Sequence, residues 1–229
     1  MVSLDDELSS IRAAGLGRLD PAEWEGLRDA IERLRMRQLA EHGPQVGDTL
    51  PDFALPDAAG RVVASGELLD RGPLVLAFFR GGWCPYCDRT LRALEAARPR
   101  LEAAGATLAG VAPCRPEELA RVAAEKGLGY LLLSDTGGRL AALCGLLYAM
   151  TPAQIAFYRD RWGADVPGVG AGTGWELPLA ASYVAGRDGV IAYAFADADW
   201  ARRAEPEDLV GTVRALSAPQ AAGIAAPAA

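Results

Sequence analysis

Two of the four cysteines, Cys84 and Cys87, are separated by two residues and carry the clearest chemistry in the sequence. They follow an apolar run with the length of a buried strand, and they precede a helical pattern. The unpaired N–H groups and the positive dipole end of such a helix stabilise a thiolate over a thiol. The second thiol adds a hydrogen-bond donor, so we expect the pKa of Cys84 to lie below its ordinary value. The spacing predicts Cys84 as the nucleophile and Cys87, one turn inward and less exposed, as the resolving thiol.

The residues around the pair complete the predicted active site. Arg80, four positions before Cys84, is expected to add positive charge or to donate hydrogen bonds to a bound oxyanion. The glycine pair and the tryptophan that separate them favour an exposed loop. The later glycine-rich segment 168–174 is expected to be a flexible loop or lid near the active site. Trp175, directly after it, is a candidate to pack over the thiols, although an aromatic residue in a loop more often packs on the surface. The residues expected to bind substrate are Gly81, Gly82, Trp83, Tyr86 and Trp175.

Two other interpretations of the cysteine pair are weaker. A zinc site needs two further ligands, but Cys114 and Cys144 are isolated and His42 is the only histidine. No metal or other cofactor is therefore expected. The two cysteines could also be inert and buried, but the neighbouring glycines and Trp83 favour an exposed loop instead. We expect Cys144 to be part of the core, whereas Cys114 follows a strand end where active sites gather, so a redox role for it stays open.

Composition limits the class of protein. The 229 residues, 51% hydrophobic, are enough for one full-sized α/β domain. A formal net charge of −7 argues against binding to nucleic acid, which requires a positive face. Apolar runs are too short to cross a bilayer, and the acidic first residues do not resemble a secretory signal. We therefore expect a cytoplasmic protein whose thiols are kept reduced and which binds no membrane.

The pattern along the chain predicts three parts. Residues 1–44 are expected to form a helical extension, with Asp20 and Pro21 starting its second helix, and residues 217–229 a disordered tail. Residues 45–216 alternate between strand and helix patterns, which indicates an α/β sheet covered on both faces. The expected strands and hairpin lie at 52–63, 74–79, 106–112, 130–133, 181–184 and 190–195. The expected helices lie at 87–104, 116–126, 137–146, 152–162 and 205–216.

Several short motifs, in a consistent order, are similar to one known family. They lie at residues 47–55, 74–79, 80–87, 134–138, 174–178, 187–191, 195–197 and 205–209. These segments resemble the peroxiredoxin-like branch of the alkyl hydroperoxide reductase/thiol-specific antioxidant family, and the resemblance covers about 45–216. It implies a thioredoxin-like fold, a central mixed sheet flanked by helices, with an N-terminal helical extension in this chain. It also implies that Cys84 is the peroxidatic and Cys87 the resolving cysteine.

The chain departs from the family at three positions. Peroxiredoxins have a proline seven residues and a threonine or serine three residues before the peroxidatic cysteine, where this chain has Ala77 and Gly81. Near Ala180 it has neither the arginine of many peroxiredoxins nor the cis-proline of thioredoxin-like oxidoreductases, since Pro178 comes two residues early. Arg80 is the candidate to replace the missing arginine.

The resemblance implies a peroxidase that reduces hydrogen peroxide or organic hydroperoxides. Cys84 would form a sulfenic acid, Cys87 a disulfide with it, and thioredoxin or a similar dithiol would restore both thiols. Three alternatives remain open: a thiol–disulfide oxidoreductase, a repurposed enzyme of small-molecule biosynthesis, and a redox sensor without catalysis. A homodimer is also expected from the family. The segment with Asp197, Asp199 and Trp200 is expected to be a solvated loop.

Overall fold

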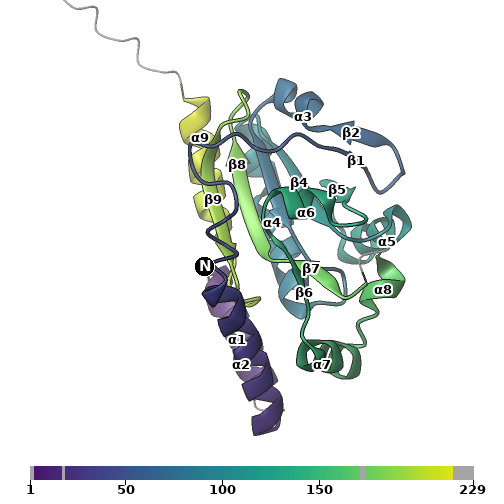
Figure 1. The fold of residues 1–229 in the computed structure, drawn as a ribbon. Helices are drawn as coiled ribbons and strands as arrows, with labels where there is room; N and C mark the ends of the chain where they lie inside the picture. The colour runs from purple at the N-terminus through teal and green to yellow at the C-terminus, as the bar shows by residue number, and fades with distance from the viewer. Residues whose placement is uncertain (1–2, 17–18, 171–173, 219–229) are drawn as a thin grey trace, which may run out of the picture.

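The computed structural model describes residues 3–16, 19–170 and 174–218. Its centre is a five-stranded mixed sheet in the order β5-β4-β3-β8-β9 (Figure 1). The strands are β3 (Leu74–Phe78), β4 (Thr107–Ala112), β5 (Leu131–Ser134), β8 (Ala180–Ala185) and β9 (Ile191–Asp197). Every residue of β3 is buried, which explains its continuous run of apolar side chains.

Helices cover the sheet, and two small antiparallel sheets lie beside it (Figure 1). On one face α4 packs against both β4 and α9, and α9 also contacts β8 and β9. The helices after the N-terminal pair are α3 (Ser65–Arg71), α4 (Pro85–Ala103), α5 (Pro116–Lys126), α6 (Arg139–Leu143), α7 (Pro152–Trp162), α8 (Val166–Val169) and α9 (Pro206–Ser217). The small sheets pair β1 (Ala54–Pro56) with β2 (Val62–Ala64), and β6 (Leu147–Ala149) with β7 (Glu176–Pro178).

Strand direction determines which loops meet at one edge of the sheet. β3, β4 and β5 are parallel, so their carboxyl ends lie at the same edge. β8 is antiparallel to β3, and β9 is antiparallel to β8, so β9 runs in the direction of β3. The segment after β9 therefore returns to the edge at which β3 ends and α4 begins. Functional sites of α/β sheets form at such an edge.

The N-terminal helices, α1 (Leu4–Leu16) and α2 (Pro21–Met36), pack on the rest of the chain. α1 contacts α4, and α2 contacts α7. Asp20 caps α2 by accepting a hydrogen bond from Glu23 N–H, while the Glu23 carboxylate accepts one from Asp20 N–H. An ion pair between Arg12 and the buried Asp199 fixes α1 to the segment after β9.

Most predicted elements are present, with some corrections. The helix expected at 137–146 is only the five residues of α6, because the chain then enters β6. The short elements α3, α8, β6 and β7 were not predicted, since three- to seven-residue segments carry little periodicity. Most of the predicted disordered tail, from residue 219 onward, lies outside the described residues. No helix of the described segments has both the length and the apolar composition that a membrane span requires.

Candidate active site

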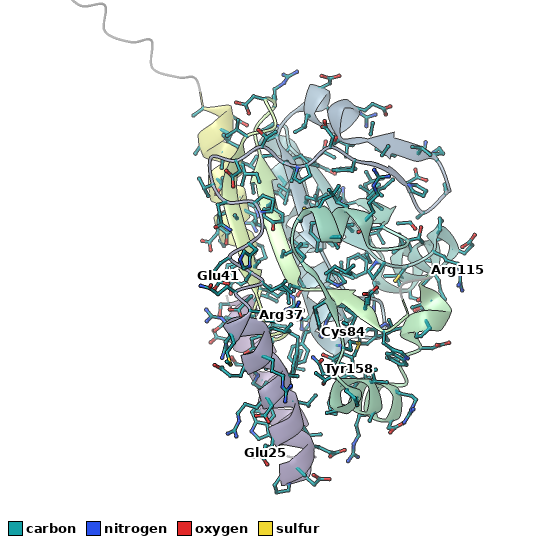
Figure 2. The ribbon with its side chains drawn as sticks, in the orientation of Figure 1. Glu25, Arg37, Glu41, Cys84, Arg115 and Tyr158 are labelled. Carbon is teal, nitrogen blue, oxygen red and sulfur yellow. The ribbon has the colours of Figure 1, made fainter. Side chains whose placement is uncertain are left out.

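The thiol pair lies at the start of α4, where the sequence predicts it. Cys84 is the N-cap of α4, with an extended backbone, and its Sγ accepts a hydrogen bond from Cys87 N–H at 3.4 Å. Pro85 occupies the first helical position, where a missing N–H leaves no hydrogen bond unmade. Figure 2 shows Cys84 next to Tyr158, between the end of the sheet and α7. The Cys84 sulfur therefore faces the helix entrance, as expected.

Arg80 connects the thiol to the aromatic residues around it. Its Nη2 donates to Cys84 Sγ at 3.0 Å, and its Nη1 donates to Tyr158 Oη at 2.6 Å. The rings of Trp83, Tyr158 and Trp162 lie 5.3–6.0 Å from the guanidinium carbon. Nε, which shares one edge of the planar guanidinium with Nη2, is buried and has no hydrogen-bond partner among the described residues. An oxygen atom bound beside Cys84 Sγ can accept this N–H.

A second buried arginine, Arg203, approaches the other thiol. Its Nη2 lies 3.9 Å from Cys87 Sγ, and its Nη1 donates to the carbonyls of Trp200 (2.5 Å) and Arg202 (2.6 Å). The backbone N–H of Arg80 also donates to Cys87 Sγ, at 3.5 Å. Arg203 reaches this place because β9 ends at the same edge of the sheet as β3. Each thiol thus has its own guanidinium.

The pKa values of the two thiols move in opposite directions. Burial raises the pKa of Cys84 well above its ordinary value, and the hydrogen bond it makes to Cys87 raises it further, against the charge of Arg80. Burial also raises the pKa of Cys87, but the hydrogen bond from Cys84 and the charges of Arg203 and Arg80 outweigh it, so that this pKa falls well below normal. The expectation of a lowered pKa at Cys84 is therefore wrong for the resting pair. The pair loses its first proton easily and holds the second tightly.

The pair is more enclosed than the sequence indicates. Both cysteines have an exposed fraction of 0%, so the expected exposed loop, with Cys87 less accessible than Cys84, is wrong. The cause is α7, whose Tyr158 and Trp162 stack at 4.7 Å between ring centroids and pack on the half-buried Trp83. The sulfurs nevertheless contact N–H groups and are not surrounded by hydrocarbon alone. The enclosure excludes bulk water and still stabilises charge.

The two glycines before the pair are required by packing. Gly81 has φ +153°, and a Cβ at this position would lie 2.5 Å from Trp83 Nε1. A Cβ on Gly82 would lie 2.6 Å from Val122 Cγ2. Trp83 Nε1 is buried, and the described part of the chain gives it no hydrogen-bond partner. Tyr86 is buried two residues after Cys84. These residues surround the site, and contact with substrate remains a prediction for them.

Trp175 lies next to the small sheet formed by β6 and β7. It is half-buried immediately before β7, its carbonyl accepts a hydrogen bond from Met150 N–H at 2.9 Å, and within the described residues it takes no part in the aromatic cluster around Arg80. Packing of Trp175 over the thiols and its contact with substrate therefore stay predictions. Residues 171–173 of the predicted lid lie outside the described residues.

The remaining cysteines are buried and unpaired with one another. Burial raises the pKa of Cys114 to about 12 and that of Cys144 to about 12, so both are neutral thiols. Cys144 packs in the core, as predicted. His42 is exposed in a turn after α2. Within the described ranges, no three histidine, cysteine or acidic side chains converge in a way that could hold a metal ion.

Comparison with known proteins identifies the family. Residues 46–194 match the sequence model of the AhpC/TSA family, which is well over half of the chain. The chain belongs to this family. The AhpC/TSA region contains Arg80, Cys84 and Cys87, whereas α1, α2 and Arg203 lie outside it.

The curated relatives of this AhpC/TSA protein include both peroxiredoxins and a methylamine utilization protein. Methylamine utilization protein MauD of Paracoccus denitrificans is 30% identical over 102 residues, which cover 43% of this chain and 50% of that protein. A putative peroxiredoxin of Mycobacterium tuberculosis is 30% identical over 102 residues, covering 44% of this chain and 66% of that one. Peroxiredoxin Q of Sedum lineare is 27% identical over 120 residues, covering 51% and 64%. The matches thus span about half to two thirds of the relatives' own lengths.

Solved structures support the thioredoxin-like fold. Peroxidoxin BcpB from Mycobacterium tuberculosis matches with a TM-score of 0.58 and 22% identity, over 75% of this chain and 97% of that one. A putative thiol:disulfide interchange protein DsbE from Chlorobium tepidum matches with a TM-score of 0.52 and 18% identity, over 76% and 99%. The predicted fold class and the predicted family resemblance are both confirmed.

Sequence reasoning missed the side chains that enclose the thiols. Helix α7 was predicted, but not that its Tyr158 and Trp162 would contact Arg80. The segment after β9 was expected to be solvated, yet Asp199 and Trp200 are buried and Arg203 approaches Cys87. One signal was present: this segment follows the last strand, at the edge where α/β sites form.

Proposed function

We propose that this AhpC/TSA protein is a thiol-dependent peroxidase in which Cys84 reacts with the peroxide and Cys87 resolves the product. The observation that carries the proposal is the edge of the Arg80 guanidinium, where Nη2 donates to Cys84 Sγ and the neighbouring Nε–H is buried without a partner among the described residues. A peroxide oxygen next to the sulfur can accept that N–H. Hydrogen bonds aimed at the oxygen on which charge develops are a major source of catalysis.

The first step needs the negative charge on Cys84. Because the Cys84 thiol donates a hydrogen bond to the Cys87 sulfur, moving that proton to Cys87 leaves a thiolate beside Arg80. The Cys84 sulfur then attacks the distal peroxide oxygen, and the O–O bond breaks. Cys84 becomes a sulfenic acid, and the leaving oxygen takes up the proton from Cys87 to become water or an alcohol, which leaves Cys87 as the thiolate.

The second step uses the contact between the two cysteines, in which Cys87 N–H lies 3.4 Å from Cys84 Sγ. The Cys87 thiolate, stabilised by Arg203 and by the backbone N–H of Arg80, attacks the sulfenic sulfur. The hydroxyl leaves as water after protonation, and a disulfide forms. An external dithiol of the thioredoxin type restores both thiols by exchange and is itself oxidised to a disulfide.

Burial favours a small substrate over a protein disulfide. Exchange with a protein disulfide requires the attacking sulfur to reach the partner's sulfur, and Cys84 has no exposed surface. The relatives named MauD and DsbE keep thiol–disulfide exchange as the second candidate. Reduction of insulin or glutathione disulfide, in the absence of peroxide turnover, would favour that candidate.

Intact mass spectrometry after one equivalent of hydrogen peroxide tests the proposal. The wild type is expected to lose two hydrogens, and Cys87→Ser to gain one oxygen that is removed by dithiothreitol. Cys84→Ser is expected to stay unchanged, and Cys114→Ser is the matched control that behaves as the wild type. Oxidation of Cys84→Ser at the wild-type rate would refute the assignment of Cys84 as the reacting thiol.

A further inference from the structure

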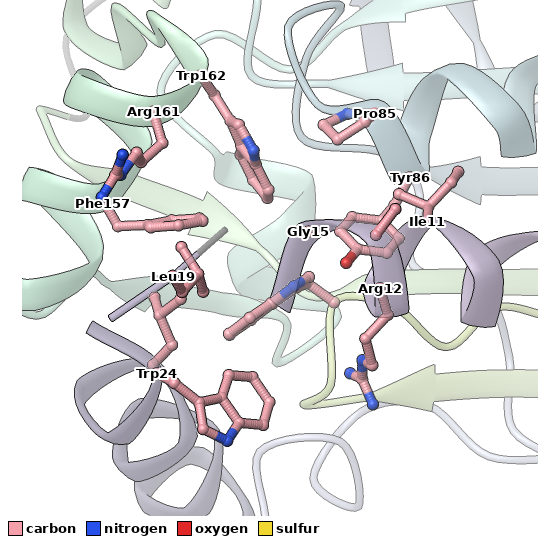
Figure 3. Close-up of a pocket in the computed structure, with 13 residues that line it drawn as sticks. Ile11, Arg12, Gly15, Leu19, Trp24, Pro85, Tyr86, Phe157, Arg161 and Trp162 are labelled. Carbon is pink, nitrogen blue, oxygen red and sulfur yellow. The ribbon is translucent and has the colours of Figure 1, made fainter. Parts of the chain in front are cut away.

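A cavity of about 500 Å³ lies beside the thiol pair, between the N-terminal helices and α7. Figure 3 shows its wall: Trp24, Phe157 and Trp162 lie on one side, and Ile11 and Tyr86 on the other. The buried Trp200 also lines it. The part of the wall that α1 and α2 supply, including Ile11 and Trp24, lies outside the residues that match the family model.

Hydrogen peroxide does not need such a space. A water molecule occupies about 30 Å³ of liquid, whereas cavities of 300–1,000 Å³ typically hold organic ligands. Aromatic walls favour flat rings, which stack or pack edge-on against them. The two arginines that line the cavity are already ion-paired, Arg12 with Asp199 and Arg161 with Glu23. The cavity therefore suits the uncharged, ring-bearing body of an organic molecule.

The cavity borders residues that connect it to the reacting sulfur. Pro85 and Tyr86, which line the cavity, directly follow Cys84 in the chain. Trp162, which also lines it, stacks on Tyr158, and the hydroxyl of Tyr158 accepts a hydrogen bond from Arg80. Tyr86 and Trp162 close the passage, with their ring centroids 6.1 Å apart. A displacement of Trp162, the last residue of α7, would open a path from the cavity toward Tyr158, Arg80 and Cys84.

We propose that this cavity binds the ring-bearing body of an aryl-substituted hydroperoxide and presents its peroxide group to Cys84. The inference rests on the proposed peroxidase function and adds the substrate class and the role of the N-terminal helices. The sulfur of Cys84 takes the distal oxygen as a sulfenic acid. The O–O bond breaks, and the ring-bearing oxygen takes up a proton and leaves as an alcohol.

Gly15 allows the cavity to be filled without disturbing the thiols. It is a helical residue of α1 that lines the cavity, and a Cβ there would meet no heavy atom within 4 Å. Gly211 in α9 also lies in a helix with nothing within 4 Å of an added Cβ, but it is outside the cavity. Gly15→Phe and Gly211→Phe are therefore a matched pair, and replacing a helical glycine favours the helix in both.

The test compares cumene hydroperoxide with hydrogen peroxide as substrates. For Gly15→Phe, the ratio of kcat/KM for cumene hydroperoxide to that for hydrogen peroxide is expected to fall by about tenfold or more. Gly211→Phe is expected to keep the wild-type ratio. Trp24→Ala, which removes the opposite wall, is expected to lower the ratio as well and serves if Gly15→Phe does not fold. An unchanged ratio in folded Gly15→Phe and Trp24→Ala overturns the proposal.

A binding experiment separates this inference from the proposed function. 2-Phenyl-2-propanol, the alcohol formed from cumene hydroperoxide, is titrated into Cys84→Ser while tryptophan fluorescence is followed. Saturable binding that Gly15→Phe weakens about tenfold or more supports the cavity, even if the wild type consumes no peroxide and the peroxidase function fails. Absence of saturable binding, or equal binding after Gly15→Phe, overturns the cavity assignment.

Discussion

Replacing Arg80 by methionine removes the guanidinium while keeping a long side chain at a buried position. Arg80 Nη2 lies 3.0 Å from Cys84 Sγ, so at an effective dielectric constant near 20 the attraction to a thiolate has an upper limit of roughly 5 kcal/mol. Desolvation of both groups offsets part of this attraction. Loss of one well-placed donor to a developing oxyanion typically costs about 10²–10³-fold in rate. We therefore expect Arg80→Met to oxidise at least ~100-fold more slowly.

The assay is a single turnover of the reduced protein with hydrogen peroxide, followed by rapid quenching and intact mass. Arg80→Met also leaves Tyr158 Oη without its donor, so thermal unfolding of each variant is measured in parallel. Arg80→Lys keeps a positive charge with fewer donors and is expected to recover part of the rate. Arg214→Met, at an exposed position of α9, is the matched control for loss of one positive charge. A folded Arg80→Met that oxidises within about threefold of the wild type would refute the role of Arg80.

Three further predictions concern the groups around the pair. Arg203→Met is expected to shift the dithiol–disulfide equilibrium in glutathione buffers toward the disulfide by roughly tenfold; no shift, or the opposite one, counts against Arg203. Gly81→Ala is expected to lower the free energy of unfolding in urea by about 1–3 kcal/mol, because its methyl group meets the neighbouring indole. Gly66→Ala, whose methyl group enters open space, is expected to show no such loss. The stability of the reduced protein is expected to rise with pH up to about 8.5, because below this pH the folded pair holds one proton and the two unfolded thiols hold two. Above it the stability is expected to fall, because the unfolded thiols then hold no proton while the folded pair still holds one. A Cys84→Ser/Cys87→Ser protein that keeps the same maximum would refute the single proton of the folded pair.

The helix starts could be predicted from the sequence because each carries a local signal. Prolines at the first helical position mark α2, α4, α5, α7 and α9, and Asp20 and Thr151 add side-chain caps. The all-apolar strand β3 and the thiol pair directly after it placed the nucleophile at a helix entrance. These predictions depend on residues within one turn of each other, so tertiary packing did not alter them.

The enclosure of the thiols could not be predicted in the same way. Arg203 lies 116 positions after Cys87 and meets it only through the register of β9, β8 and β3. The aromatic cover comes from α7, whose weak amphipathic pattern does not show which face is buried. Burial of the pair therefore requires three segments that are distant in sequence: the start of α4, helix α7 and the segment after β9. The glycines next to the cysteines give no information about this packing.

The charges of the site differ between the reduced and the oxidised pair, and this difference bears on turnover. In the reduced protein one thiolate charge lies beside two buried guanidiniums, those of Arg80 and Arg203. Formation of the disulfide removes that charge and leaves two buried cations with less compensation, which is costly in a medium of low dielectric constant. Stabilising the reduced form makes a disulfide a stronger oxidant. The same arginines that we propose to assist attack on the peroxide are therefore expected to make the Cys84–Cys87 disulfide easier to reduce, so that both halves of the proposed cycle use one electrostatic arrangement.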